Sequence, residues 1–186
     1  MFSKNVSSAN NQQERVPKDV ENLKYYLAGF VDGEGCFSVT ICKNKYTALR
    51  WKMDPLFQVY QHKDNSRILY IFKDVFNCGY VSKKGGNPSC YVYCVDRISD
   101  ILDCVIPFFD RYQLVGEKYN NFLLFKQIVN GISLKEHLTK EGFVRLAKKA
   151  FQMNRNGKYR KNYLNIIIKS LEQSPETKSQ THLKVR

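Results

Sequence analysis

Apolar residues recur along the chain with two different periods, and the switch between them predicts the order of its elements. Residues 20–33 carry apolar side chains three and four positions apart, which is the spacing of one helix face. Residues 36–45 and 49–61 alternate apolar with polar side chains, which predicts strands whose buried face includes Phe57 and Val59. The folded part therefore begins with a helix and two half-buried strands.

The next part of the chain repeats this order and then becomes helical. The segment Asp64–Ser66 is typical of a helix start, and the helix after it is expected to stop at Cys78–Gly79. Strands near residues 80–84 and 89–95 are expected to form a hairpin around a Gly-rich turn. Helices are then expected over four ranges: 97–106, closed by Pro107; 117–130, closed by Gly131; 140–152; and 161–171.

This order of elements describes an α+β domain in which helices cover one face of a four-stranded antiparallel sheet. We expect a single domain over residues 19–171, with a flexible polar arm at 1–18 and a disordered basic tail at 172–186. The alternation also predicts which side chains lie on the uncovered face of the sheet. They are small, amide, aromatic or basic: Ser38, Thr40, Cys42, Asn44, Gln58, Tyr60, Ser82 and Lys84, with Cys90 and Cys94 as further candidates.

The charge of the chain points to a polyanionic partner. Thirty Lys and Arg residues against 17 Asp and Glu give a formal net charge of +13, which favours nucleic acid over a neutral substrate. The segment over residues 140–169 holds nine basic residues and one acid. Lys148, Lys149, Arg160 and Lys161 in this segment are candidates for contacts with a phosphate backbone. A solvated basic helix surface is the alternative.

Cysteine and histidine usage argues against several other classes. The six cysteines include no CxxC pair and the three histidines are scattered, so the sequence does not indicate a zinc site. Reduced thiols are expected. No apolar stretch approaches the roughly 20 residues that span a bilayer, and no membrane partner is expected. The chain is rich in Asn, Lys, Tyr, Phe and Ile, which have AT-rich codons, so we expect a gene in an organelle genome.

Two carboxylates stand where the first helix is expected to end. Asp32 and Glu34 alternate with Gly33 and Gly35, which are typical of a helix stop. This is the negative end of the helix dipole, where an acid is destabilising by about 0.3 to 1 kcal/mol. A divalent cation bound to the acids would make their contribution favourable. The alternative is an ordinary amphipathic helix that ends at a Gly-rich turn. A calcium loop of the EF-hand type is excluded because a third acidic or amide ligand is missing.

The same helix offers a bare surface to another helix. Gly29 and Gly33 lie four residues apart, on one face, with Ala28 beside them. Missing side chains allow two helix backbones to approach closely, as in small-xxx-small pairs. The pattern occurs once in the chain, so packing through it would need a second copy of the chain and would place both copies of Glu34 beside a two-fold axis.

The end of this helix also carries a family resemblance. The segment Tyr26–Gly35 reads YLAGFVDGEG and resembles the signature of the LAGLIDADG homing endonucleases, with Glu34 at the position of the metal-binding acid. Later segments resemble further blocks of that family in the same order: Phe57–Asp64, Ile106–Asp110, Glu117–Lys118 ahead of Phe122, and Leu138–Gly142. The resemblance covers roughly residues 20–165.

The resemblance implies a fold and an assembly. The fold is a core of αββαββα order with extra C-terminal helices, in which the four-stranded antiparallel sheet lies in a DNA major groove. A chain with one motif resembles the homodimeric members of the family. This implies a dimer interface through Ala28, Gly29, Asp32 and Gly33.

The resemblance also implies a cofactor and a set of catalytic residues. Mg²⁺ is implied, held by Glu34 and the carbonyl of Gly33, with Mn²⁺ or Ca²⁺ able to replace it for binding. Gln61 and Lys118 resemble the pocket residues that position water and stabilise charge, and Asp32 serves as support. Without the family pattern, Gln61 is a strand-end amide and Lys118 an ordinary lysine at a helix start.

The implied activity is hydrolysis of both strands of a long pseudo-palindromic DNA target, with short 3′ overhangs. The implied location is a mitochondrion or chloroplast of a fungus, alga or protist. Two other classes remain open. A group I intron maturase would bind intron RNA through the sheet and the basic surface, and a repressor-like protein would bind DNA on the same fold without cleaving it.

Overall fold

The computed structural model describes residues 16–17, 19–154 and 163–173. The arm expected at 1–18 and the tail expected at 172–186 therefore lie almost wholly outside the described residues. Between them the chain forms the α+β domain that the sequence predicts. None of the described helices is long and apolar enough to cross a membrane.

Four strands form one antiparallel sheet in the order β1-β2-β4-β3. The strands are β1 Gly35–Lys43, β2 Trp51–His62, β3 Tyr80–Lys83 and β4 Cys90–Val95. In the long β1–β2 pair, Gly35 lies opposite Val59 and Lys43 lies opposite Trp51. The predicted four-stranded sheet is confirmed.

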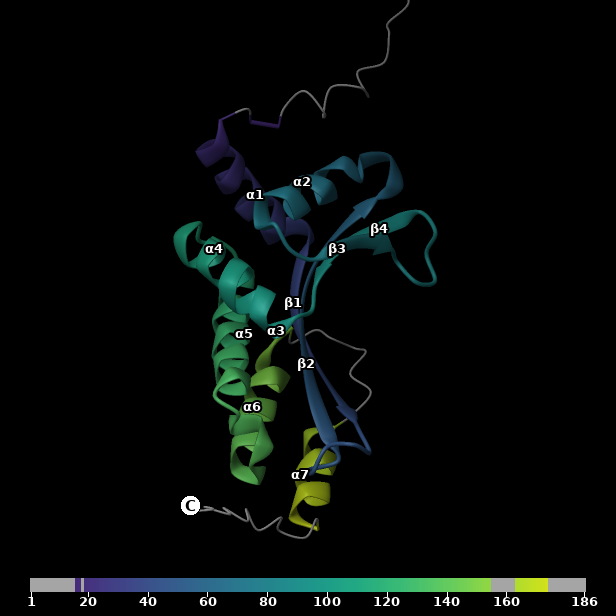
Figure 1. The fold of residues 1–186 in the computed structure, drawn as a ribbon, viewed down its shortest axis with the longest axis vertical. Coiled ribbons are helices and arrows are strands. Elements are labelled where there is room, and N and C mark those ends of the chain that lie inside the picture. Colours follow the sequence, from purple (N-terminus) through teal and green to yellow (C-terminus); the bar gives the residue numbers. More distant parts are fainter. Residues whose placement is uncertain (1–15, 18, 155–162, 174–186) are drawn as a thin grey trace, which may run out of the picture.

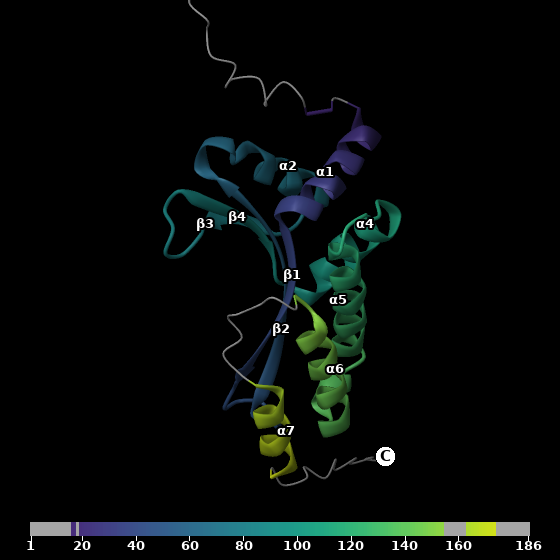
Figure 2. The same cartoon turned by 180° about the vertical axis from the view of Figure 1, so that it is seen from behind.

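Helices cover one face of this sheet. They are α1 Val20–Glu34, α2 Arg67–Phe76, α3 Ile98–Asp100, α4 Ile106–Arg111, α5 Lys118–Ser133, α6 Lys140–Gln152 and α7 Leu164–Glu172, with short 3-10 turns at Lys63–Asn65 and Glu136–Leu138. Figures 1 and 2 show α5 and α6 along one side of β1 and β2, with α1 and α2 across the upper part and α7 beside the lower end. The indole Nε1 of Trp51 donates a hydrogen bond of 2.6 Å to Ser170 Oγ, which ties α7 to β2.

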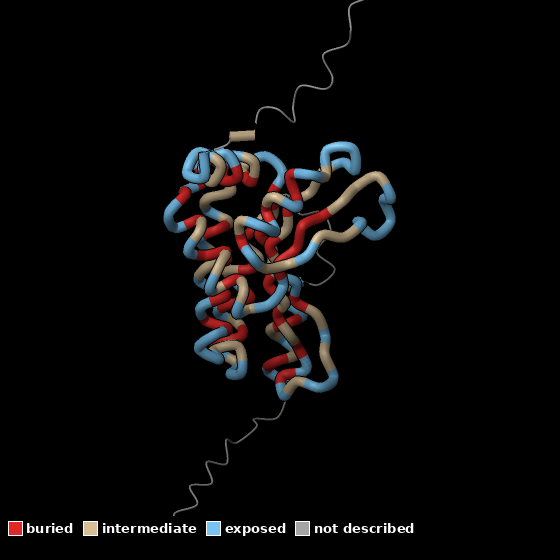
Figure 3. Tube along the Cα trace, turned by 45° about the horizontal axis from the view of Figure 1, so that its top comes forward, coloured by how far each residue is buried: buried red, intermediate tan, exposed pale blue. Residues whose placement is uncertain are grey.

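Aromatic side chains fill the space between the sheet and the helices. Phe37 of β1 stacks on Phe57 of β2 with ring centroids 5.1 Å apart, and its other neighbours include Phe109, Phe122 and Phe125. Figure 3 shows buried positions along the strands and on the inner sides of the helices. The expected burial of Phe57 and Val59 is confirmed, since both are fully buried, and Gln58 and Tyr60 therefore point to the opposite face.

Pro107 does not end a helix, and that expectation is wrong. The chain stays helical from Ile98 to Arg111, with a π-helix at Ile101–Val105 between α3 and α4. Pro107 lies in the first turn of α4. A proline lacks a backbone N–H and crowds the preceding carbonyls, so the wider π-helical turn lets the chain continue through it.

Gly131 does not end a helix either. It is buried inside α5, which continues to Ser133. A Cβ at Gly131 would lie 2.6 Å from Leu146 Cδ2 of α6. This glycine therefore allows two helices to pack closely, and the packing outweighs its intrinsic cost in a helix.

Gly142 provides a direct test of close packing at the start of α6. A Cβ there would lie 2.0 Å from the carbonyl oxygen of Glu136 and 2.8 Å from Oγ1 of the capping residue Thr139. Gly142→Ala should lower the free energy of unfolding by about 1 to 3 kcal/mol, the usual cost of overpacking. Urea denaturation measures it, with Gly85→Ala as control, because a Cβ at Gly85 meets nothing within 4 Å. Equal unfolding midpoints for the two variants would contradict the prediction.

Candidate functional site

The motif helix passes directly into the first strand. Helix α1 is capped at its start by Asp19, whose carboxylate accepts a hydrogen bond of 2.8 Å from the N–H of Asn22. It ends at Glu34, and β1 begins at Gly35 with no intervening loop. A Cβ at Gly35 would lie 2.4 Å from Cγ1 of the buried Val31. Glycine is therefore required at the junction, and Glu34 is the last side chain before it, whereas Gly33 lies within the helix.

Asp32 is held by the start of another helix. Its carboxylate accepts hydrogen bonds from the N–H groups of Val115, at 2.8 Å, and Gly116, at 3.3 Å. These two residues lie just ahead of α5. The positive end of α5 therefore offsets the unfavourable position of Asp32 at the negative end of α1. These contacts fit the supporting role that the family resemblance implies for Asp32.

Lys118 is brought to the same place from a distant part of the chain. It is the first residue of α5, and its Nζ donates a hydrogen bond of 3.2 Å to the carbonyl oxygen of Gly33, 85 residues away. Burial lowers the pKa of Lys118, while the nearby Cys36, Asp32 and Glu34 act in the opposite direction. A partly buried cation thus lies against the end of the motif helix.

Glu34 differs from Asp32 because its carboxylate is free. It is exposed, and among the described residues it forms no hydrogen bond or ion pair. Both oxygens can therefore accept a further partner. Unlike Asp32, Glu34 forms no hydrogen bond with the described residues, and the nearby charge of Lys118 partly offsets its unfavourable position at the helix end.

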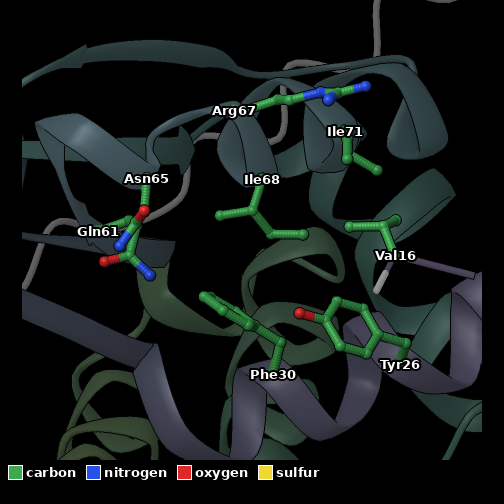
Figure 4. A pocket seen from close by; sticks show the side chains of 8 residues that line it. All are labelled: Val16, Tyr26, Phe30, Gln61, Asn65, Arg67, Ile68 and Ile71. Carbon is green, nitrogen blue, oxygen red and sulfur yellow. The ribbon is translucent and has the colours of Figure 1, made fainter. Parts of the chain in front are cut away.

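Gln61 lies near the end of β2 and faces a small pocket between α1 and α2. Its Oε1 accepts a hydrogen bond of 2.7 Å from the N–H of His62. The pocket has a volume of about 70 Å³, and Figure 4 shows Gln61 beside Asn65 at one end of it, with Phe30 and Tyr26 of α1 below. Lys118 is therefore bound directly to the end of the motif helix. Gln61 instead shares a pocket with Tyr26 and Phe30, which lie earlier in the same helix.

One chain supplies oxygen donors of the type that Mg²⁺ prefers, but few of them. The free carboxylate of Glu34 fits a hard cation. The Gly33 carbonyl accepts the Lys118 ammonium and keeps a second lone pair. No group of three or more His, Cys, Asp or Glu able to hold a metal ion occurs in the described part of the chain. The oxygen donors are of the type that Mg²⁺ prefers, but the described part of one chain supplies too few of them to complete its coordination.

The glycine face of α1 is open in the single chain. A Cβ built at Gly29 or Gly33 would meet nothing within 4 Å. Ala28 is different, since it is 3% exposed and belongs to the core of its own chain. Its expected place in a dimer interface is therefore corrected, because successive helix positions are rotated by about 100° and Ala28 points inward.

The uncovered sheet face carries most of the side chains expected there. Gln58 Oε1 accepts a hydrogen bond of 2.7 Å from the Tyr60 hydroxyl, and the Nζ of Lys84 lies 4.6 Å from the centre of the Tyr60 ring. These three side chains form one polar cluster on β2 and the β3–β4 hairpin. Further positions on this face are half-buried or exposed: Ser38, Thr40, Cys42, Ser82 and Cys90.

Some residues expected to contact DNA lie elsewhere. Asn44 follows the end of β1, and its Oδ1 accepts a hydrogen bond of 2.9 Å from the N–H of Tyr46, so it closes a local turn. Lys148 and Lys149 belong to α6 in the helical layer, where Lys149 donates to Gln127 of α5. Both are thus separate from the open sheet face. Arg160 and Lys161 are outside the described residues.

The interpretation of the sequence also missed residues on the open face. Lys52 and Asp54 lie in β2, and Tyr80 and Asp96 lie at the β3–β4 side of the sheet. The alternation that placed Gln58 and Tyr60 extends back to Asp54 and Lys52, so the signal was present in the sequence. The uncovered face therefore holds two carboxylates and is richer in acids than expected.

Comparison with known sequences identifies the family. The sequence model of the LAGLIDADG endonuclease family matches residues 27–129, more than half of the chain. The chain belongs to the LAGLIDADG endonuclease family. The match contains the end of the motif helix, the whole sheet and Lys118, so the resemblance seen in the sequence is confirmed.

Individual LAGLIDADG proteins resemble the chain over much of its length. It is 32% identical over 130 residues to probable intron-encoded endonuclease 2 of Neurospora crassa, a match that covers 69% of this chain and 28% of that protein. It is 36% identical over 107 residues to homing endonuclease I-ApeII of Aeropyrum pernix, a match that covers 58% of this chain and 62% of that protein. The matched part is less than two thirds of either relative.

A solved LAGLIDADG structure has the same fold. The archaeal intron-encoded homing endonuclease I-Vdi141I, complexed with DNA, matches with a TM-score of 0.77 and 30% identity. The match covers 83% of this chain and 97% of that chain. The expected LAGLIDADG fold is therefore confirmed.

The bonds of Asp32 can be tested without any activity. Asp32→Asn keeps one acceptor oxygen and removes the charge, so it should lower the free energy of unfolding by about 1 to 2 kcal/mol. It should also speed hydrogen exchange at the amide of Val115. Glu34→Gln is the matched control and should not lower stability, because Glu34 has no hydrogen-bond or ion-pair partner among the described residues and its charge lies at the unfavourable end of α1. Equal stability of the two variants would show that Asp32 does not hold the α5 start.

Proposed function

We propose that the chain is a site-specific, metal-dependent DNA endonuclease that acts as a homodimer. The observation that carries the proposal is the free carboxylate of Glu34 beside the Lys118 ammonium, at the end of the motif helix and next to the open sheet. The relatives support the activity, because they are named as endonucleases, and one matched structure is complexed with DNA.

The proposed dimer packs two α1 helices through Gly29 and Gly33. The space around both glycines supports it, since bare backbone lets a second helix approach closely. A two-fold axis at this contact would place the two copies of Glu34 near each other. The second chain and the DNA phosphates would then complete the ligand set that one chain lacks.

In the proposed reaction, residues of the chain hold the metal, the phosphate and the water. Mg²⁺, when bound, would lower the pKa of a water molecule and offset the charge that develops on the phosphate. Glu34 and the Gly33 carbonyl would hold it. Lys118 would stabilise negative charge on the phosphate oxygens. Asp32 fixes the loop that leads to Lys118, and the Gln61 amide would orient water.

The proposed substrate is a long pseudo-palindromic DNA duplex that lies along the open sheet face. The polar cluster of Gln58, Tyr60 and Lys84 supports this, because amide and lysine groups can contact base edges in the major groove. The net charge of +13 supports a polyanion. Cleavage of both strands with short 3′ overhangs is part of the proposal.

The proposed setting is an intron of an organelle genome in a fungus, alga or protist. Intron-encoded relatives come from Neurospora crassa and Schizosaccharomyces pombe, and a DNA endonuclease relative comes from Chlamydomonas moewusii. One observation favours a second function, binding of intron RNA. The basic side chains of α6 lie in the helical layer, apart from the sheet face.

The role of Glu34 gives the first test of this function. Glu34→Gln should abolish strand scission in Mg²⁺, because the amide cannot replace a carboxylate on the metal, while DNA binding should stay within about twofold. Gel assays of cleavage and of binding in Ca²⁺ measure both effects. Cleavage at the wild-type rate would show that the metal assignment is wrong.

The dimer is tested by filling the glycine face. Gly29→Leu or Gly33→Leu should give monomers by sedimentation at tens of micromolar, because an isobutyl group cannot fit between two close backbones. Since both positions are open in the single chain, each variant should keep its helical circular dichroism. Asn130→Leu on exposed α5 surface is the control and should remain dimeric. Wild-type protein that is monomeric with and without DNA would refute the dimer.

A further inference from the structure

Two carboxylates occupy the middle of the sheet face that is proposed to contact DNA. These two acids, Asp54 and Asp96, line an open hollow of about 480 Å³ together with four polar neighbours: Thr40, Lys52, Gln58 and Tyr80. The hollow lies over β1, β2, β3 and the end of β4. In a chain with an excess of 13 positive charges, acids at this position are unexpected for a surface that only contacts phosphates.

Asp54 is held in place and remains accessible. Its carboxylate lies 2.7 Å from Nζ of Lys52, and its side chain is 48% exposed. The Cys42 thiol lies 3.9 Å from the same carboxylate, and Thr40 is the residue opposite Asp54 on β1. The hydrogen bond to Asp54 raises the pKa of Lys52. The carboxylate therefore keeps a fixed direction on the strand and has free acceptor positions toward solvent.

Asp96 repeats this arrangement at the other side of the hollow. It accepts a hydrogen bond of 3.1 Å from the Tyr80 hydroxyl. Neither acid can bind a phosphate, since like charges repel. In a major groove, however, carboxylates accept hydrogen bonds from the exocyclic amino group of cytosine. The chemistry of the hollow therefore matches base edges and not the DNA backbone.

We infer that Asp54 is a specificity-determining residue that selects cytosine at one position of each DNA half-site. The inference rests on the proposed function, and it deepens that function by assigning a base to a residue. Lys52 holds the carboxylate so that it faces the groove. Asp96 with Tyr80 forms a second, weaker element of the same kind.

The position of the selected base follows from strand geometry. A strand rises about 3.3 to 3.4 Å per residue, which equals the spacing of successive bases in DNA. Gln58 lies opposite Cys36, two residues after Glu34, whereas Asp54 lies opposite Thr40, further along β1. Asp54 is therefore expected to select a base about four pairs farther from the cleavage centre than the base contacted by Gln58.

Selection of bound duplexes from a randomised DNA library tests this inference. Wild-type protein should enrich cytosine at one position, mirrored in the second half-site. Asp54→Asn should change that preference to adenine, because an asparagine amide both donates to and accepts from adenine. The preference for cytosine over adenine there should fall by about 5- to 150-fold, the value of one good base contact. Gln58→Ala marks the reference position, about four pairs nearer the centre.

Two outcomes would overturn the inference. Asp54→Asn could leave every base preference unchanged, or it could tighten binding to all sequences equally, which would mean that Asp54 only repels phosphate. Asp74→Asn on α2 is the control for loss of an exposed acid, and it should change no preference. Because the library is selected for bound and not for cut DNA, it tests the base preference of Asp54 separately from the proposed endonuclease activity. A protein that enriches one sequence and cuts nothing would refute the endonuclease and would still report the base selected by Asp54.

Discussion

The contact between the end of α1 and the start of α5 determines the arrangement of the whole site. Asp32 accepts hydrogen bonds from two backbone N–H groups ahead of α5, and Lys118 donates a hydrogen bond to the Gly33 carbonyl. The negative end of one helix thus meets the positive end of another, and each offsets the other. Because these bonds occupy Asp32, Glu34 is left as the free acid at the helix end.

The sheet places this acid relative to the surface that is proposed to contact DNA. Gly35 has no space for a side chain, so the helix passes into β1 without a loop, and the open sheet face begins next to Glu34. Aromatic packing of Phe37 against Phe57 fixes β1 and β2 on the core side. The bond from Trp51 to Ser170 secures the far end of the same pair. A rigid β1–β2 pair would keep the proposed base contacts at fixed distances from the proposed cleavage centre.

Local patterns in the sequence were sufficient for the fold and for part of the site. The helical period of α1 and the alternation around Phe57 and Val59 depend on neighbouring residues, and both were predicted correctly. The bonds of Asp32 join residues 83 and 84 positions apart, and no local pattern carries that information.

The incorrect expectations have separate causes. Rules for Pro107 and Gly131 describe an isolated helix, whereas a π-helical turn and close packing against α6 decide the outcome in the fold. Asn44 was misplaced because β1 ends at Lys43, two residues before the expected end, and the Asn44 side chain then closes a turn. Asp54 was missed although the alternation of β2 includes it, since acids were not expected on a surface for DNA.

The most direct test of the account is cleavage by a mixed dimer. A dimer of one wild-type chain and one Glu34→Gln chain, purified with two different affinity tags, would be incubated with Mg²⁺ and a supercoiled plasmid that carries the selected target. If each Glu34 serves one strand, the mixed dimer should nick the plasmid to open circles without making linear DNA. Linear product at the wild-type rate would contradict the account, because two strands would then be cut without two copies of the acid.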